Sequence, residues 1–208
     1  MLGGLVFEQL ETLKEACLPG PDDPELLAGC RSRGLPAFER LYRDHGPRMM
    51  SIALNLLGNV ADAEDVVQDA FLKIFRGGGG FRGRSALSTW IYRILVNSCY
   101  DLMRRKKRRR EEPELEPEGG ERPQASAGAP DHPLRLALEK SLARLDPRRR
   151  SIFLLFEVEG FKHREIAEIL NIPEGTSKNL LFEAKRELHR LLSEDRGGSK
   201  SRWHEDRV

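Results

Sequence analysis

The feature that most constrains this chain is an interruption near its middle. Residues 109–133 are dominated by Glu, Pro, Gly, Ala and Ser, and prolines recur throughout the stretch. Because proline lacks a backbone donor and the stretch holds few apolar side chains, it can neither continue a helix nor build a core. We therefore expect a flexible, acidic linker with a small folded domain on either side of it.

The segment before the linker has the pattern of a helical domain. From residue 35 to residue 108 apolar side chains recur every three or four positions, as they do in amphipathic helices. Gly58 and the run Gly77–Gly80 interrupt the pattern, which predicts three helices or helix groups. Residues 1–34 are read as a leader without an assigned role, since prolines break the helical spacing there.

The segment after the linker predicts a second domain made of shorter helices. Helical spacing returns from residue 134 to residue 192 and is interrupted at Asp146-Pro147, at Glu159-Gly160 and at residues 171–175. Beyond it, residues 193–208 have no apolar stripe and are expected to form a mobile tail. The expected fold is all-α, with two small helical domains.

Composition excludes several classes of protein. The 208 residues include 33% charged and 7% aromatic side chains, which favours short amphipathic helices around modest cores. Cys17, Cys30 and Cys99 are widely spaced and form no Cys-x-x-Cys pair, so we expect no disulfide framework and no metal site. The chain has no long apolar run and no secretory signal pattern, which predicts a cytoplasmic protein without membrane insertion. It has no Gly-rich phosphate loop ending in Lys-Ser or Lys-Thr, and we expect no cofactor and no catalytic residue.

The segment from residue 62 to residue 76 predicts a helix with one apolar stripe and one acidic face. The acidic face holds five polar side chains, which are Asp62, Glu64, Asp65, Gln68 and Asp69. A rigid row of acids suits a basic protein partner. From the residues alone, a solvated face is the simpler reading, because acids in a first turn also complement the helix dipole and Asn59 can cap the helix.

A loop and a helix follow, with features that suit nucleic acid. Phe81-Arg82-Gly83-Arg84 combines a ring on which a base can stack with guanidinium groups for phosphates, although Phe81 alone can equally fill a core. In the helix after it, Trp90 lies on the inward stripe, while an outward row is formed by Arg93, Asn97, Asp101 and Arg104. The seven basic residues Arg104–Arg110 predict contact with a polyanion.

Residues 162–192 have the pattern of a helix-turn-helix. A short apolar helix, a turn at residues 171–175 and a second helix with a core stripe follow one another. The start of the second helix enters the major groove in that geometry, which singles out Thr176, Ser177, Lys178, Asn179 and Phe182, with Lys185 and Arg186 near phosphates. An ordinary helical hairpin is the alternative, and His163 is expected at the surface.

Four blocks of sequence resemble the extracytoplasmic-function (ECF) sigma factors of bacterial RNA polymerase. They are A-F-E-R-L-Y-R-D-H at 37–45, D-A-E-D-V-V-Q-D-A-F at 62–71, F-R-G-R-S-A-L-S-T-W-I-Y-R-I at 81–94 and E-I-A-E-I-L-N-I-P-E-G-T at 165–176. They occur in the order of that family. The resemblance implies a sigma region 2 bundle at 35–108 and a sigma region 4 helix-turn-helix at 134–192.

The resemblance also implies function and site residues. Such a protein is a transcription initiation factor that binds core RNA polymerase, directs it to promoter DNA and melts it, and an anti-sigma factor is the expected regulator. Contacts with the clamp helices of the largest subunit are implied for Asp62, Glu64, Asp65, Gln68 and Asp69. Contacts with the minus-ten element are implied for Phe81, Arg82, Arg84, Trp90, Arg93, Asn97, Arg104 and Arg105. Contacts with the minus-thirty-five element are implied for Thr176, Ser177, Lys178, Asn179, Phe182, Lys185 and Arg186.

Some residues depart from the family pattern, and two other functions are alternatives. Leu180 and Glu183 stand where the family often has basic residues, and Ser177 replaces an aliphatic one. A helix-turn-helix repressor or activator would leave the first domain unexplained. A metal-dependent nuclease would need convergent ligands beyond the acids of one helix.

Overall fold

The chain is described by a computed structural model that covers residues 28–29, 32, 34–77, 85–111 and 133–201. The elements of these ranges are helical, and they contain no strand. They are α3 (Leu35–Leu57), α4 (Val60–Gly77), α5 (Leu87–Glu111), α6 (Pro133–Arg144), α7 (Pro147–Phe153), the π-helical turn η2 (Leu154–Val158), α8 (His163–Leu170) and α9 (Glu174–Ser201). The all-α prediction is confirmed.

The first unit consists of α3, α4 and α5, and its helix boundaries follow from the local sequence. Gly58 adopts a left-handed conformation with φ of 69° and ends α3 by donating its backbone N–H to the carbonyl of Leu54. The next helix begins at once, because the side-chain oxygen of Asn59 accepts a hydrogen bond of 3.0 Å from the backbone N–H of Asp62. The predicted break at Gly58 and the cap at Asn59 are both confirmed.

The second unit consists of α6, α7, η2, α8 and α9, joined by the tight turns that the sequence predicts. Asp146 caps α7 by accepting from the backbone N–H of Arg148 at 2.9 Å. Gly160, with φ of 72°, follows the π-helical turn, and Asn171, with φ of 51°, ends α8. Asparagine is one of the few residues that tolerates this conformation. The helix-turn-helix is thus formed by α8 and α9.

Three boundaries differ from the sequence prediction. The helix α5 continues to Glu111 and α6 begins at Pro133, so both ends of the predicted linker belong to helices. Proline is well tolerated in the first turn of a helix, where its missing N–H has no partner to lose. The helix α9 continues past residue 193, where the predicted tail begins, to Ser201.

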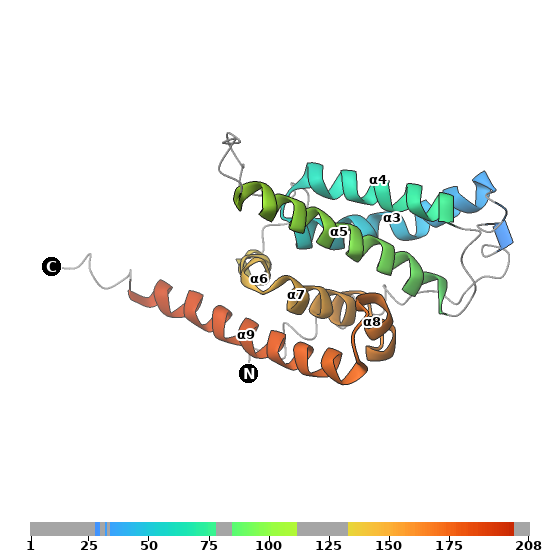
Figure 1. Ribbon diagram of the computed structural model, residues 1–208. Coiled ribbons are helices and arrows are strands. Elements are labelled where there is room, and N and C mark those ends of the chain that lie inside the picture. The colour runs from blue at the N-terminus through green and yellow to red at the C-terminus, as the bar shows by residue number, and fades with distance from the viewer. Residues whose placement is uncertain (1–27, 30–31, 33, 78–84, 112–132, 202–208) are drawn as a thin grey trace.

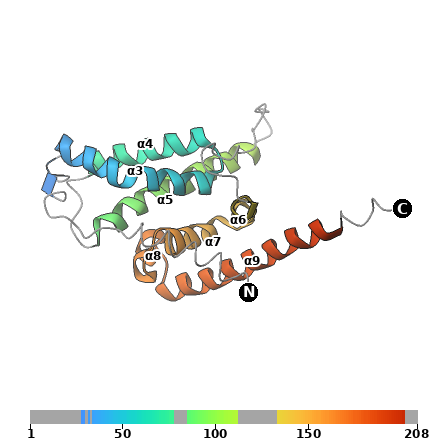
Figure 2. The same cartoon turned by 180° about the vertical axis from the view of Figure 1, so that it is seen from behind.

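The two units pack against each other, which the sequence did not predict. Figures 1 and 2 show four layers, with α4 outermost, α3 and α5 next, then α6 to α8, and α9 on the far side. Buried apolar residues of both units belong to one continuous core. The helix α5 is central because it is apolar on two sides, and Tyr92, Val96 and Cys99 add a second buried stripe to the one formed around Ile91 and Leu95.

None of the described helices is both long and apolar enough to span a lipid bilayer.

Candidate nucleic-acid interface

The polar face of α4 is brought together largely as predicted. Glu64, Asp65, Gln68 and Asp69 are exposed, while the stripe that includes Val66 and Ala70 is buried. Asp62 differs from the other acids, since most of its side chain is covered and its carboxylate forms an ion pair with Lys106 of α5. The face therefore presents three acids and one amide, and Asp62 ties α4 to α5.

Apolar side chains next to this face were missed by the sequence analysis. Leu72 is 49% exposed and lies one turn after Gln68 and Asp69 on the same side of α4. Tyr42 of α3 is 60% exposed, and its ring packs 5.0 Å from that of Phe71. Large apolar side chains beside carboxylates are typical of a protein-binding surface rather than of a solvated face. The signal was present, since Tyr42 lies within the first quoted block.

On α5, the predicted residues divide into exposed and half-buried groups. Asn97, Arg104 and Arg105 are exposed, and Arg104 forms an ion pair with Asp101 one turn away. Trp90 and Arg93 are half-buried. Basic residues from Arg104 onward continue the helix, so their charges are arranged around a helical rod rather than in a coil.

Phe81, Arg82 and Arg84, predicted to hold unpaired bases and phosphates, lie outside the described residues.

The start of α9 presents most of the side chains predicted for it. Thr176, Lys178, Asn179, Phe182 and Arg186 are exposed. The guanidinium of Arg186 lies 6.0 Å from the centre of the Phe182 ring, and this ring is 65% exposed. Together these residues form a surface with amide, hydroxyl, cationic and aromatic groups, which is the range of groups that contact base edges and phosphates.

Ser177 is a correction, because the structure places it inside the domain. Its side chain is fully buried, and its hydroxyl lies within hydrogen-bond distance, 3.0 Å, of Nδ1 of His163. One helical turn separates Ser177 from Leu181, so the core stripe of α9 begins earlier than the apolar residues indicated. His163 is itself not a simple surface residue, since it stacks on Phe156 at 4.6 Å.

Lys185 is half-exposed and makes an ion pair of 2.6 Å with the buried carboxylate of Glu157. Its ammonium also lies 5.8 Å from the centre of the Phe156 ring. A buried carboxylate needs such a partner, so Lys185 holds α9 against η2 as well as lying on the predicted DNA side.

Two family models match the chain, Sigma-70 region 2 over residues 41–109 and Sigma-70, region 4 over residues 135–188. The ECF RNA polymerase sigma factor SigM of Mycobacterium tuberculosis is 32% identical over 172 residues, which cover 82% of this chain and 84% of that protein. This chain belongs to the ECF sigma factor family. It is a transcription initiation factor, as the sequence blocks implied, and the repressor alternative is not favoured.

Other sigma factors and solved structures agree. The ECF RNA polymerase sigma factor SigE of Mycolicibacterium smegmatis is 30% identical over 164 residues, which cover 76% of this chain and 63% of that protein. The sigma factor RpoE of Bartonella quintana, solved in complex with the anti-sigma factor NepR, superposes with a TM-score of 0.63 at 27% identity, covering 75% of this chain and 96% of that one. CnrH, solved with the cytosolic domain of CnrY, has the same fold, with a TM-score of 0.64 at 24% identity over 84% of this chain and 99% of that one.

In this sigma factor, Glu183, which departs from the family pattern, has two partners within the second unit. Its carboxylate forms an ion pair of 2.8 Å with Arg149 of α7 and accepts a hydrogen bond of 3.0 Å from the amide nitrogen of Asn179. The negative charge of Glu183 on α9 is therefore paired with a cation of the same unit. Glu183 also orients Asn179, whose amide is one of the exposed groups at the start of α9.

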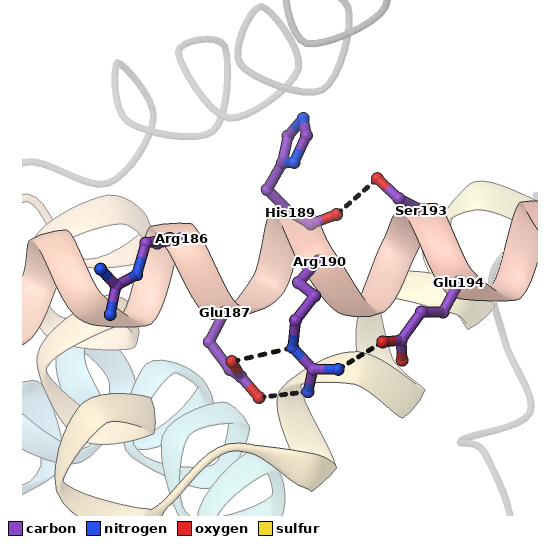
Figure 3. A pocket seen from close by; sticks show the side chains of 6 residues that line it. All are labelled: Arg186, Glu187, His189, Arg190, Ser193 and Glu194. Carbon is purple, nitrogen blue, oxygen red and sulfur yellow. Dashed lines mark hydrogen bonds and ion pairs between the residues drawn. The ribbon is translucent and has the colours of Figure 1, made fainter.

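A shallow pocket on α9 of the sigma factor is lined by one helix alone. Figure 3 shows Arg190 between Glu187 and Glu194, with ion pairs to both, and the Ser193 hydroxyl donating to the His189 carbonyl. The hydrogen bond that Glu187 accepts from Arg190 holds the pKa of Glu187 below the usual range of a glutamate. Arg190 is thus paired within the helix, and Glu194 also forms an ion pair of 3.7 Å with Arg144 of α6.

Proposed function

We propose that this sigma factor binds core RNA polymerase through α4, separates the minus-ten element with α5 and the residues Phe81, Arg82 and Arg84 before it, and reads the minus-thirty-five element with α9. The observation that carries the proposal is the mixed acidic and apolar face of α4. Glu64, Asp65 and Asp69 share this surface with the exposed ring of Tyr42 and the exposed side chain of Leu72. A basic helical partner such as the clamp helices of the largest subunit has the complementary charge.

The minus-ten assignment rests on charge and position. Asn97 has an exposed amide that can pair with a base edge, and Arg104 and Arg105 begin an exposed basic stretch suited to phosphates. Melting needs no nucleotide hydrolysis in this scheme, because binding unstacked bases more tightly than paired ones shifts the equilibrium.

The minus-thirty-five assignment rests on the exposed start of α9. Asn179 and Thr176 can hydrogen-bond to base edges, Phe182 can contact a thymine methyl group, and Lys178 and Arg186 can neutralise phosphates. Lys178 is paired with Glu174 at 2.7 Å, so phosphate binding would exchange one anion for another.

We further propose that an anti-sigma factor regulates the chain. RpoE, whose fold this chain shares, was solved in complex with such an inhibitor. The exposed aromatic and aliphatic residues of α3 and α4 offer a surface that an inhibitor can cover.

Run-off transcription of fragmented bacterial genomic DNA by core polymerase tests the polymerase face. We expect new transcript starts that share two spaced upstream motifs with the wild-type chain, and at least a tenfold loss of them with Asp65→Ala/Asp69→Ala. Glu168→Ala/Glu194→Ala, which removes two acids of the second unit, is the matched control and should keep the starts. If the two double variants transcribe equally well, α4 is not the polymerase face.

A further inference from the structure

The start of α9 carries an amide whose direction is fixed by a carboxylate one turn later. The side chain of Asn179 is exposed, and its Nδ2 donates a hydrogen bond of 3.0 Å to Oε1 of Glu183. An ionised carboxylate has only acceptor atoms, so the group of Asn179 that faces it must be the NH2 and not the oxygen. The side-chain oxygen of Asn179 is therefore turned away from Glu183.

The carboxylate of Glu183 is held in turn by a cation of another helix. Its second oxygen, Oε2, lies 2.8 Å from Nη2 of Arg149 in α7 and accepts a hydrogen bond of 3.1 Å from Nε of the same guanidinium. Because the two oxygens serve different partners, both sides of the carboxylate are restrained. Arg149, Glu183 and Asn179 thus form a chain of polar contacts from α7 to the exposed start of α9, which we call the polar triad.

The contribution of the Arg149–Glu183 pair to the fold is small. Apolar packing already joins α7 to α9, since Ile152 of α7 and Leu181 and Ala184 of α9 are buried in the core. The side chains of Arg149 and Glu183 are 39% and 27% exposed, and an ion pair so open to water adds little to stability. A negative charge beside DNA also weakens binding to phosphates. The effect of Glu183 on Asn179 therefore explains its presence better than its effect on the fold.

An amide held in this direction offers a DNA base a particular pattern of groups. The oxygen of Asn179 accepts, and the second Nδ2 hydrogen, which Glu183 does not use, is available as a donor. In the major groove, adenine presents an N6 donor beside an N7 acceptor, which matches this pattern with two hydrogen bonds. Guanine presents two acceptors there, so the fixed oxygen would face another oxygen. The held amide favours adenine and opposes guanine.

We propose that Glu183, held by Arg149, is a positioning residue that makes Asn179 select adenine over guanine at one position of the minus-thirty-five element. The inference rests on the proposed assignment of α9 to that element. Glu183 acts through Asn179 and does not itself contact a base. Arg149 has a second effect, because its charge offsets the charge of Glu183, which would otherwise repel the phosphates of bound DNA.

Transcription by core polymerase with the full chain tests this selection, on a library of promoters whose minus-thirty-five element is randomised. With the wild type, we expect one position at which adenine is preferred to guanine by about fivefold or more. Asn179→Ala should abolish the preference at that position alone. Glu183→Ala should lower the adenine-to-guanine ratio there by about threefold or more, because the amide can then turn either way. Glu187→Ala, one turn further along α9, is the matched control and should leave every position unchanged.

Glu183→Gln gives the sharpest readout, because glutamine has nearly the same size but carries a donor in place of one oxygen. Arg149 can only donate, so it holds the remaining oxygen of the glutamine, and the NH2 of the glutamine then faces Asn179. This NH2 turns the oxygen of Asn179 inward and its NH2 outward, so the ratio should shift further toward guanine than in Glu183→Ala. In Arg149→Met/Glu183→Gln the glutamine is free to turn its oxygen back to Asn179, and the preference for adenine should return in part.

The direction of the amide is also measured without DNA, by nuclear magnetic resonance of the isotope-labelled chain. In the wild type, one Nδ2 hydrogen of Asn179 should be shifted downfield by its bond to the carboxylate. Glu183→Ala should remove that shift, and Glu187→Ala should keep it. A signal that does not respond to Glu183→Ala would overturn the inference.

Two transcription results would overturn the inference and leave the proposed function intact. In one, Asn179→Ala removes a base preference that Glu183→Ala leaves unchanged. In the other, Glu183→Ala alters the preferences just as strongly in the Asn179→Ala background, which would mean that Glu183 contacts DNA itself. A wild-type chain that shows no minus-thirty-five preference, although its amide signal responds to Glu183→Ala as expected, would instead refute the proposed role of α9, and the inferred selection with it.

Discussion

Replacing Arg150 with methionine should strongly destabilise the protein. The side chain of methionine has a similar apolar length but donates no hydrogen bond. In the wild type, the Arg150 guanidinium donates to the carbonyls of Asn55 and Leu56 in the first unit and to those of Ala143 and Leu145 in the second, at 2.5 to 3.2 Å. Each of these oxygens would lose a charged donor in a place where the arginine is 9% exposed.

The size of the effect can be worked out from these four bonds. A hydrogen bond to a charged group contributes about 1.5–3 kcal/mol, and the four are not additive because they share one cation and water can reach some of the oxygens. Leaving a buried acceptor without a donor costs about 1–3 kcal/mol, and with several of the four oxygens affected we expect a loss of about 3–5 kcal/mol in the free energy of unfolding. Arg150→Lys keeps the charge but can reach fewer oxygens, so it should cost roughly half of that.

Urea unfolding followed by circular dichroism measures this difference. With a denaturant slope of about 2 kcal/mol per molar, the midpoint for Arg150→Met should fall by roughly 1.5–2.5 M. Arg148→Met, an exposed arginine of the same helix, should change the free energy of unfolding by less than about 0.5 kcal/mol. If Arg150→Met stays within about 1 kcal/mol of the wild type, Arg150 does not join the two units energetically, and the reasoning is refuted.

Three further outcomes are expected. Phe182→Ala should lower transcription from promoters that depend on the minus-thirty-five element by about 5- to 150-fold, the equivalent of 1–3 kcal/mol. Glu187→Ala, on the same helix, should leave this transcription unchanged. If both variants lower it equally, Phe182 does not contact DNA. Burial, followed by the charge of Arg48, lowers the pKa of His45, while Asp44 raises it. The unfolded chain therefore takes up a proton at this position before the folded chain does, and stability decreases as the pH falls below about 6.5 toward the folded value. Urea midpoints at pH 7.5 and 5.5 should differ less for His45→Gln than for the wild type, and an unchanged difference would contradict this. Burial also raises the pKa of Cys99 to about 12, so alkylation at pH 8, followed by peptide mass spectrometry, should modify Cys99 only after unfolding; rapid labelling of the folded chain would show that the thiol is accessible.

Much of the local structure could be predicted from the residues alone. Gly58, Asn59, Asp146 and Asn171 end or begin helices for reasons of backbone geometry and side-chain bonding that act over a few positions. The four sequence blocks also indicated the family, since both the blocks and their order can be found in the sequence without a structure. Helical periodicity predicts that the acids of α4 lie on one face.

Errors arose where the outcome depended on neighbours in space. The sequence predicts Ser177 at the DNA surface because it is polar and near the start of α9, yet it lies in the core stripe, where its hydroxyl is 3.0 Å from Nδ1 of His163. Glu183 looked unsuited to a DNA-binding helix until its partners Arg149 and Asn179 were seen. Periodicity could have corrected the first error, but no local pattern reveals that residue 149 lies against residue 183.

The sequence by itself determined which segments are helical and where most of them end, because these properties depend on contacts within a few residues. It also indicated the family, because the four blocks can be compared without any structure. Only the tertiary structure decided that the two units close on each other. The packing of the two units depends on residue pairs that are distant in the chain, such as Arg48 with Glu159 and Arg150 with the end of α3. A buried charge requires a partner, but the residues next to it in the sequence do not reveal which residue that partner is. The packing of α5 between both units brings the partners together.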